Sequence, residues 1–347
     1  MCAATPYSLV QRNPVVTPER LLAELVPPPR FADVSLASYQ PDPAEPSQQV
    51  ALQRVGAFLA SIDRRGSGSA AGRLHRWWQP ALQPVDPPGL YLDGGFGVGK
   101  THLLAAAWHA APGPKLFATF VELTHLVGAL GFAAAVEQLS AYRLVCIDEF
   151  ELDDPGDTVL VSSLLGRLVA AGVSLAATSN TLPDRLGEGR FAAEDFRREI
   201  QGLSAHFETV RVDGDDYRHR GLPSAPPPLD DTAVTAAASR LGGASLDHFV
   251  DVCRHLQSVH PSRYGSLLDG VETCCLHDVR TVSDQTVALR LVVLADRLYD
   301  RDVPVVTSGV PLDRLFAAEL LTGGYRKKYA RAVSRLIALA TEGANAI

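Results

Sequence analysis

The sequence is poor in lysine, in paired cysteines and in long apolar runs, and each shortage narrows the class of protein. Its 347 residues carry 32 basic and 39 acidic side chains, and the net charge of −7 argues against a chain-wide affinity for nucleic acid or anionic membranes. The five cysteines are odd in number and show no C-x-x-C spacing, so neither disulfides nor zinc are expected. No stretch reaches the roughly eighteen apolar residues of a membrane span, and the first residues lack a secretory pattern. We therefore expect a cytoplasmic protein without a transmembrane segment.

One of the few lysines lies in a glycine-rich stretch. Only four of the 32 basic residues are lysines, namely Lys100, Lys115, Lys327 and Lys328. Lys100 belongs to GGFGVGKT, residues 94–101, which matches the pattern G-x-x-x-x-G-K-[ST]. A short apolar run, LYL, precedes the pattern and a helix-forming run, HLLAAAWHAA, follows it. This is the strand–loop–helix context that a phosphate-binding loop needs, and a compact ammonium suits a crowded phosphate cradle.

The glycine-rich stretch predicts a site for ATP and Mg²⁺. Glycines allow consecutive backbone N–H groups to point at phosphate oxygens, and the following helix adds its positive N-terminal end. Lys100 is predicted to reach the β- and γ-phosphates, and the hydroxyl of Thr101 a magnesium ion. A glycine-rich turn without function is the alternative, which the flanking strand and helix disfavour. The predicted nucleotide-binding residues are Gly94, Gly95, Phe96, Gly97, Val98, Gly99, Lys100 and Thr101.

Two later stretches predict the catalytic half of the site. In YRLVCIDEF, residues 142–150, Asp148 and Glu149 follow an apolar run, and ligands of parallel sheets lie at the carboxyl ends of the strands. Asp148 is predicted to hold Mg²⁺, and Glu149 to orient and polarise the attacking water. Asn180 follows the next apolar run and is predicted to hydrogen-bond that water or the γ-phosphate. Its alternative role is to begin the turn before Pro183.

The pattern of apolar runs predicts an α/β fold, a P-loop NTPase with a parallel sheet of the additional-strand, AAA-like class. An N-terminal arm and helix are expected over residues 1–85, the ATPase core over 86–222, and a smaller, mainly helical, lid-like domain over 230–347. The expected core strands are Leu90–Leu92, Lys115–Phe120, Tyr142–Phe150, Ser174–Thr178 and Phe207–Val212.

The C-terminal region contains a weaker echo of the segment that bears Asn180. VVTSGVPLDRL, residues 305–315, has Gly309 in place of the asparagine, so we expect a similar strand and turn there without a catalytic role. Pro304–Thr307 is the one strand predicted in this region. The predicted helical runs are Asp247–Val259, Val287–Leu298 and Tyr325–Ala340.

Several segments together resemble one family. The order GGFGVGKT, LVCIDEF, LAATSN and DYRHR, followed by LADRLYDRDVPVVTSG and ARAVSRL, is similar to the ZapE family of cell-division ATPases and their mitochondrial relatives, the lactation-elevated protein ATPases. The resemblance implies ATP hydrolysis coupled to remodelling of a protein partner, such as a division-ring or membrane-associated client. KLFATFVELTHLV lacks the histidine-rich segment expected there, and the Q-R-x-R-F segment expected before the fifth strand is also absent, which favours a divergent branch.

The resemblance further implies a homo-oligomer in which an arginine of one subunit completes the site of the next. Arg190 is the first choice for this arginine finger, ahead of Arg197 and Arg198, because it lies between the Asn180 strand and the fifth strand. The departures from the family pattern leave the finger's identity open.

Two other functions compete with this interpretation. THLLAAA after the loop also resembles helicase loaders, although the net charge and the lack of a basic stripe interleaved with aromatic residues argue against nucleic acid as a partner. A non-hydrolysing nucleotide switch is disfavoured because Lys100, Asp148, Glu149 and Asn180 are all present.

Overall fold

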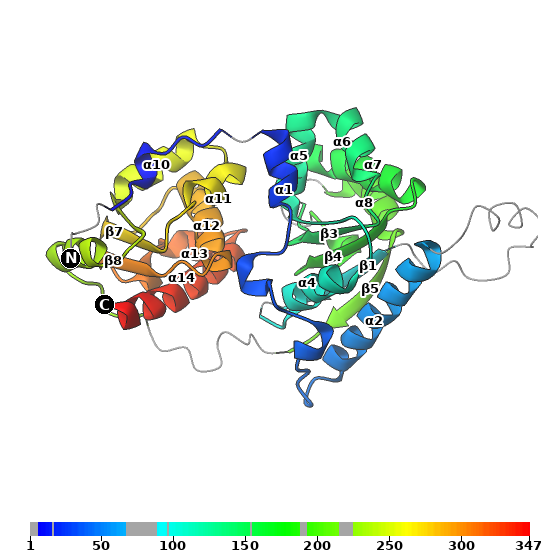
Figure 1. Cartoon of the computed structure of the whole chain (residues 1–347), viewed down its shortest axis with the longest axis horizontal. Coiled ribbons are helices and arrows are strands. Elements are labelled where there is room, and N and C mark those ends of the chain that lie inside the picture. The colour runs from blue at the N-terminus through cyan, green and yellow to red at the C-terminus, as the bar shows by residue number, and fades with distance from the viewer. Residues whose placement is uncertain are drawn as a thin grey trace, which may run out of the picture. The chain divides into compact units, whose positions relative to one another are not determined.

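The computed structural model describes residues 6–15, 17–66, 89–95, 97–152, 155–187, 193–214 and 225–347. The chain divides into two compact units (Figure 1). The core unit comprises Pro18–Pro27 and Phe31–Tyr217, and the C-terminal unit comprises Met1–Thr17, Pro28–Arg30 and Arg218–Ile347. The N-terminal segment therefore contributes residues to both units, and the domain boundaries expected from the sequence stay a prediction.

A five-stranded parallel sheet with the order β2-β3-β4-β1-β5 forms the centre of the core unit. The three inner strands are buried along their whole length, because helices cover both faces of a parallel sheet, whereas the edge strand β5 alternates between buried and exposed residues. The carboxyl ends of β1, β3 and β4 meet at one edge. The strands are β1 (Gly89–Gly94), β2 (Lys115–Thr119), β3 (Leu144–Asp148), β4 (Ser174–Ser179) and β5 (Phe207–Val212).

Helices cover both faces of this sheet (Figure 1). On one face, α2 and α4 share a hydrophobic cluster with inward side chains of the strands, among them Leu90, Leu92 and Cys146. On the other face, α5 and α7 pack on the strands, α6 contacts both of these helices, and α8 packs on α7. The helices are α1 (Pro18–Glu24), α2 (Pro46–Gly66), α4 (Lys100–Ala110), α5 (Phe120–Leu130), α6 (Phe132–Leu139), α7 (Pro155–Ala170) and α8 (Arg197–Ser204).

Within the described ranges, no single helix is long and apolar enough to cross a membrane. Only α5 and α6 counted together reach that length and composition, and they are bent by 118° relative to each other.

The C-terminal unit contains a second parallel sheet, with the order β6-β7-β8. Helix α9 packs on one face with a small cluster that includes Val234 and Cys275. Helices α10, α12 and α14 lie on the other face in a larger cluster. The elements are β6 (Ala244–His248), β7 (Thr273–Val279), β8 (Val305–Gly309), α9 (Asp231–Arg240), α10 (Phe249–Ser258), α11 (Tyr264–Leu267), α12 (Gln285–Asp300), α13 (Ala318–Thr322) and α14 (Arg326–Ala346).

Residues near the N-terminus add to this second sheet. Tyr7 forms a parallel bridge with Ser245 of β6. The Asp247 carboxylate accepts hydrogen bonds from the Ser8 hydroxyl at 2.6 Å and the Leu9 N–H at 2.8 Å. The described 3-10 turns of the chain are η1 (Leu9–Gln11), η2 (Pro29–Phe31), η3 (Leu36–Ser38), η4 (Pro183–Arg185), η5 (Ala193–Phe196), η7 (Pro261–Arg263) and η8 (Leu312–Arg314).

The predicted α/β class and the five core strands are confirmed, and so is a mainly helical C-terminal region. The predicted strand Tyr142–Phe150 is too long, because Glu149 leaves the extended conformation with a φ of 53°. The prediction of one C-terminal strand is incomplete, since β6 and β7 were missed. Both carry polar residues within an otherwise apolar run, namely Asp247 in β6 and His277 and Asp278 in β7.

Candidate nucleotide-binding site

The glycine-rich loop turns directly after β1. Gly94 ends the strand against β5, where a Cβ would lie only 2.0 Å from the carbonyl oxygen of Val212. Gly97 and Gly99 have φ values of 70° and 88°, in the left-handed region that favours glycine. Helix α4 begins immediately afterwards, so its free N–H groups face the loop. Phe96, a predicted member of this loop, lies outside the described residues.

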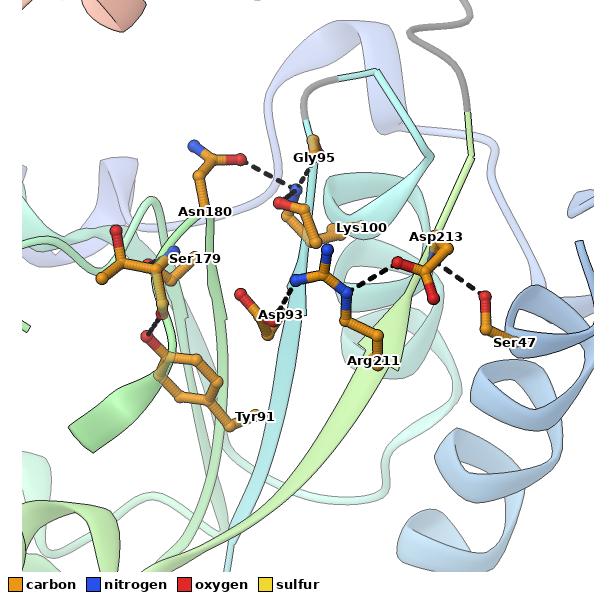
Figure 2. A network of polar contacts seen from close by, with 11 residues as sticks. Ser47, Tyr91, Asp93, Gly95, Lys100, Ser179, Asn180, Arg211 and Asp213 are labelled. Atoms are coloured by element: carbon orange, nitrogen blue, oxygen red, sulfur yellow. Dashed lines mark hydrogen bonds and ion pairs between the residues drawn. The ribbon is translucent and has the colours of Figure 1, made fainter. Parts of the chain in front are cut away.

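Lys100 lies at the centre of the loop and is only 8% exposed. Its Nζ donates hydrogen bonds to the carbonyl oxygen of Gly94 at 3.0 Å, to that of Gly95, and to Oδ1 of Asn180 at 2.9 Å (Figure 2). The Nδ2 of Asn180 donates in turn to Oε1 of Glu151 at 3.4 Å. The structure thus joins the predicted lysine of the loop to the predicted asparagine beyond β4.

Thr101 and Asp148 form the neighbouring part of the site. The Thr101 hydroxyl donates to Oδ1 of Asp148 at 3.2 Å, and the hydroxyl of Thr178 on β4 donates to the same oxygen. Asp148 is 6% exposed, so these hydroxyls stabilise a carboxylate that is largely removed from water. Thr178 was missed as a site residue, although only Ser179, the last residue of β4, separates it from Asn180.

Glu149 follows Asp148 in a strained conformation. Its φ of 53° is uncommon for a residue with a Cβ, and its N–H donates to the Thr178 Oγ1 at 3.1 Å. Strain of this kind costs on the order of 1–3 kcal/mol and concentrates at functional sites. Glu151 is 9% exposed and accepts the bond from Asn180 described above, so a further carboxylate lies beside this amide. The sequence signal for Glu151 was the third acid in DEFE, residues 148–151.

An ion pair between a buried carboxylate and an exposed arginine supports the base of the loop. Asp93 on β1 is 1% exposed and accepts a hydrogen bond from Nη1 of Arg211 on β5 (Figure 2). Arg211 also donates to Oδ1 of Asp213 at 2.7 Å, and the N–H of Asp213 donates to Ser47 at 2.8 Å. The hydrogen bonds to Asp93 and Asp213 raise the pKa of Arg211. This network joins α2 and β5 to the strand that leads into the loop, and sequence reasoning missed it.

Aromatic side chains hold both sides of the site. The Tyr39 hydroxyl donates to the carbonyl oxygen of Val98 at 3.1 Å, and its ring packs on Gly99. Burial raises the pKa of Tyr39 to about 12, so its hydroxyl remains a donor at neutral pH. Tyr91 donates to the carbonyl oxygen of Thr181 at 2.8 Å and thereby fixes the turn that bears Asn180.

The donor set fits a magnesium ion bound together with a nucleotide. Mg²⁺ prefers oxygen ligands and is usually held by one or two carboxylates, several waters and the substrate phosphates. The Thr101 hydroxyl and the Asp148 carboxylate, 3.2 Å apart, supply such oxygens beside the loop. Among the described residues, no group of three or more His, Cys, Asp or Glu side chains could hold a metal without a nucleotide.

Not every predicted residue can be placed. Arg190 lies outside the described residues, as does the DYRHR segment, residues 216–220. Arg197 and Arg198 begin α8. The structure brings the loop, Asp148, Glu149 and Asn180 together at one sheet edge, and their catalytic roles remain predictions.

The fold and the loop define a class of protein. A strand, β4, lies between the loop strand β1 and the acidic strand β3, and this additional strand together with the glycine-rich loop before α4 is the arrangement of a P-loop NTPase. The chain belongs to the AFG1-like ATPase family, whose sequence profile matches residues 15–241 and 228–345. The predicted family resemblance is therefore confirmed.

Individual relatives agree with this assignment. The cell division protein ZapE of Escherichia coli K12 is 27% identical over 355 residues, which cover 88% of this chain and 93% of ZapE. Lactation elevated protein 1 homolog B of Danio rerio is 26% identical, covering 71% of this chain and 60% of the relative. Among solved structures, DnaI (17% identity, 57% of this chain and 98% of that chain, TM-score 0.40) and the DnaC helicase loader (18%, 53% and 99%, 0.35) match too distantly to support an argument.

Proposed function

We propose that this chain binds ATP with Mg²⁺ at the loop of the core unit and hydrolyses it to ADP and phosphate. The observation that carries the proposal is the position of the Lys100 ammonium, which is bonded to the loop and to Asn180 beside the Thr101–Asp148 pair. Such a lysine can exchange its carbonyl and amide partners for phosphate oxygens without moving its backbone.

Each side chain of the site has a separate role in the proposed reaction. Lys100 and the loop N–H groups bind the phosphates, and Thr101 and Asp148 hold the Mg²⁺, which neutralises phosphate charge when bound. Glu149 accepts a proton from water as the water oxygen bonds to the γ-phosphorus and the bond to the bridging oxygen of ADP breaks. Asn180, released from Lys100, hydrogen-bonds the attacking water or the γ-phosphate.

We further propose that hydrolysis serves to remodel a protein partner in the cytoplasm. The support is family membership and the similarity to a protein named for cell division. A division-ring or membrane-associated client is the expected partner, and the acting form is expected to be a homo-oligomer in which Arg190 completes the neighbouring site. A helicase-loader function would instead require nucleic-acid machinery as the partner.

The test combines turnover with capture. Phosphate release by the purified full chain is measured with and without Mg²⁺, and we expect turnover that depends on both Mg²⁺ and protein concentration. The Glu149→Gln variant, loaded with Mg-ATP, is then used to isolate the client from a lysate of the source cells. Absence of ATP turnover at every protein concentration would contradict the proposal, and recovery of DNA-replication proteins would replace the remodelling role with the loader role.

A further inference from the structure

The echo between two segments of the sequence has a structural counterpart. Thr-Ser followed by Asp-Arg-Leu recurs at identical spacing in residues 178–186 and 307–315. In the structure, each segment is the end of a parallel strand, β4 or β8, followed by a 3-10 turn, η4 or η8. The residues before these turns, Leu182 and Pro311, have the same conformation, with φ of −57° and −58° and ψ of 145°.

The similarity extends over the whole order of elements. The core unit runs α4, β2, α5, β3, α7, β4 and η4, and the C-terminal unit runs α9, β6, α10, β7, α12, β8 and η8, apart from short additional helices in each. The strand orders β2-β3-β4 and β6-β7-β8 correspond. Phe117 pairs with Cys146 as Leu246 pairs with Cys275. One constant numbering offset relates these pairs, since 246 minus 117 equals 275 minus 146.

An uncommon backbone conformation recurs at the same offset, since 278 minus 149 is again 129, and the hydroxyl that binds it is displaced by one residue, since 308 minus 178 is 130. Glu149 and Asp278 have φ values of 53° and 52°, and Asp302 is the only other described non-glycine residue with a positive φ. The N–H of Glu149 donates to the Thr178 hydroxyl at 3.1 Å, and that of Asp278 donates to the Ser308 hydroxyl at 2.9 Å. Parallel sheets in general do not require a strained residue at this point, so its recurrence indicates a common origin of the two units.

The loops after the first helix of each unit agree as well. Gly113 and Gly243 both have a positive φ, 76° and 68°. The Arg143 N–H donates to the carbonyl of Pro114, which follows Gly113, at 2.7 Å. The Glu272 N–H donates to the carbonyl of Gly243 itself at 2.8 Å. The two units thus share turns, strain and the register of β2–β3 and β6–β7, whereas the β7–β8 register is displaced by one residue from that of β3–β4. They also differ where the first helix begins.

We infer that the C-terminal unit is a second copy of the P-loop core in which the protein's own carboxylates have closed the phosphate position. Leu229 bridges to Ser308 in parallel, in the place that β1 takes beside β4. Only Asp230 then separates Leu229 from α9, and residues 225–230 contain no glycine. In so short a connection, the counterpart of the phosphate site is reduced to the N–H groups at the start of α9.

In the C-terminal unit, carboxylates occupy the position that corresponds to the lysine and loop of the core unit. Asp231 is the first residue of α9, as Lys100 is the first residue of α4, and its Oδ1 accepts a hydrogen bond from the Ser308 hydroxyl. The Asp230 carboxylate accepts the Ala233 N–H at 2.7 Å. The negative side chains satisfy the positive helix end that would otherwise attract an anion, and they repel phosphate. ATP is therefore excluded from this unit, and this inference rests only on contacts within the C-terminal unit.

Hydrogen exchange of α9 tests the inference in the full chain. All variants carry Lys100→Ala, so that phosphate bound at the core loop cannot contribute. The test variant adds Asp230→Ser and Asp231→Ala, in which serine keeps an N-cap and both charges are removed. The matched control is Asp284→Ser, which changes the cap of α12 at a helix start with no counterpart of the phosphate loop.

In the test variant, inorganic phosphate at about ten times its Kd should slow amide exchange in α9 about tenfold relative to chloride at equal ionic strength. The Lys100→Ala parent and the control should show no such slowing. Slowing in the parent would mean that the position is open, and an unresponsive test variant would mean that it is not a phosphate position; either result overturns the inference. If the double change prevents folding, Asp231→Asn, which keeps an acceptor for Ser308, should show the same effect at a few-fold, and its failure to do so would count equally against the inference.

Discussion

The starts of α4 and α9 differ in charge although the structures around them correspond. In the core unit a glycine-rich loop precedes Lys100, whereas in the C-terminal unit Asp230 and Asp231 begin the helix directly after Leu229. In each unit a buried hydroxyl, that of Thr178 on β4 or Ser308 on β8, accepts the N–H of the strained acid, which is Glu149 after β3 or Asp278 within β7. The comparison shows that the backbone frame alone does not make a nucleotide site. The length of the loop before the helix and the sign of the charge at the helix start determine whether a unit can bind a nucleotide.

The largest expected effect is on the lysine of the core site. Lys100→Ala should abolish ATP binding while the fold persists. The change removes a cation that is bonded to loop carbonyls and to one amide, and it leaves the side chains of the apolar core in place. Titration with a fluorescent ATP analogue measures the loss. Lys115→Ala is the matched control, since Lys115 donates to carbonyls at the other end of α4 and should leave ATP affinity unchanged. Equal affinity of Lys100→Ala and the wild type would remove the core loop as the phosphate site.

The next largest effect is expected from loss of the arginine that one subunit contributes to the site of the next. An arginine finger is worth about a thousandfold or more in turnover, so Arg190→Ala should slow hydrolysis on that scale while binding persists. Arg197→Ala and Arg198→Ala, which change the alternative finger candidates on α8, are measured in the same assay and should turn over faster than Arg190→Ala. Turnover per molecule, followed over a dilution series, should fall as oligomers dissociate. A constant value on dilution contradicts an intersubunit site, and wild-type turnover by Arg190→Ala excludes that residue.

The two strained acids should differ in function. Glu149→Gln keeps the size and hydrogen-bonding capacity of the side chain but removes its charge, so turnover should fall about a hundredfold while ATP affinity stays near normal. Asp278→Asn, at the corresponding position of the C-terminal unit, should leave both unchanged. Affinity and turnover are measured on one preparation. If Glu149→Gln turns over ATP at the wild-type rate, another residue such as Glu151 activates the water.

Removing either strand hydroxyl should lower the stability of the protein, but only one of the two removals should lower its ATPase activity. Thr178→Val and Ser308→Ala each leave a backbone N–H without its acceptor and should lower the free energy of unfolding by about 1–3 kcal/mol, as measured by denaturant titration. Only Thr178→Val should also slow turnover, about tenfold or more, because Thr178 supports the Asp148 carboxylate. An equal loss of turnover in both variants would show that the effect is one of stability.

The smallest expected effect concerns the tyrosine beside the loop. Tyr39→Phe removes the hydrogen bond to Val98, a loss of about 1 kcal/mol, and should weaken ATP affinity about fivefold. Tyr264→Phe removes a similar bond, to the Leu256 carbonyl at 2.7 Å in the C-terminal unit, and should leave affinity unaltered. Isothermal titration of both variants decides whether Tyr39 positions the loop.

The sequence predicted the parts of the site that local patterns encode. The loop glycines, Lys100 and the strand ending in Asp148 and Glu149 are contiguous motifs, and the core fold follows from their order. The Asp93–Arg211 pair could not be predicted, because it depends on β5 lying beside β1, a neighbour relation that no local pattern encodes.

Sequence patterns also revealed little of the similarity between the two units, for a different reason. The shared features are backbone conformations and the register of one strand pair, and few side chains are identical apart from the Thr-Ser and Asp-Arg-Leu groups. The three strands of the C-terminal unit carry polar residues among apolar ones, so that alternation and apolar runs failed to mark β6 and β7.

Nucleotide stoichiometry tests the central claim, that one of two similar units holds ATP, most directly. Equilibrium dialysis of labelled ATP with Mg²⁺ against the full-length Glu149→Gln chain avoids loss of ligand through turnover. We predict one ATP per chain at saturation, and none when Lys100→Ala is added. Two ATP molecules per chain, or one that persists after Lys100→Ala, would contradict the account.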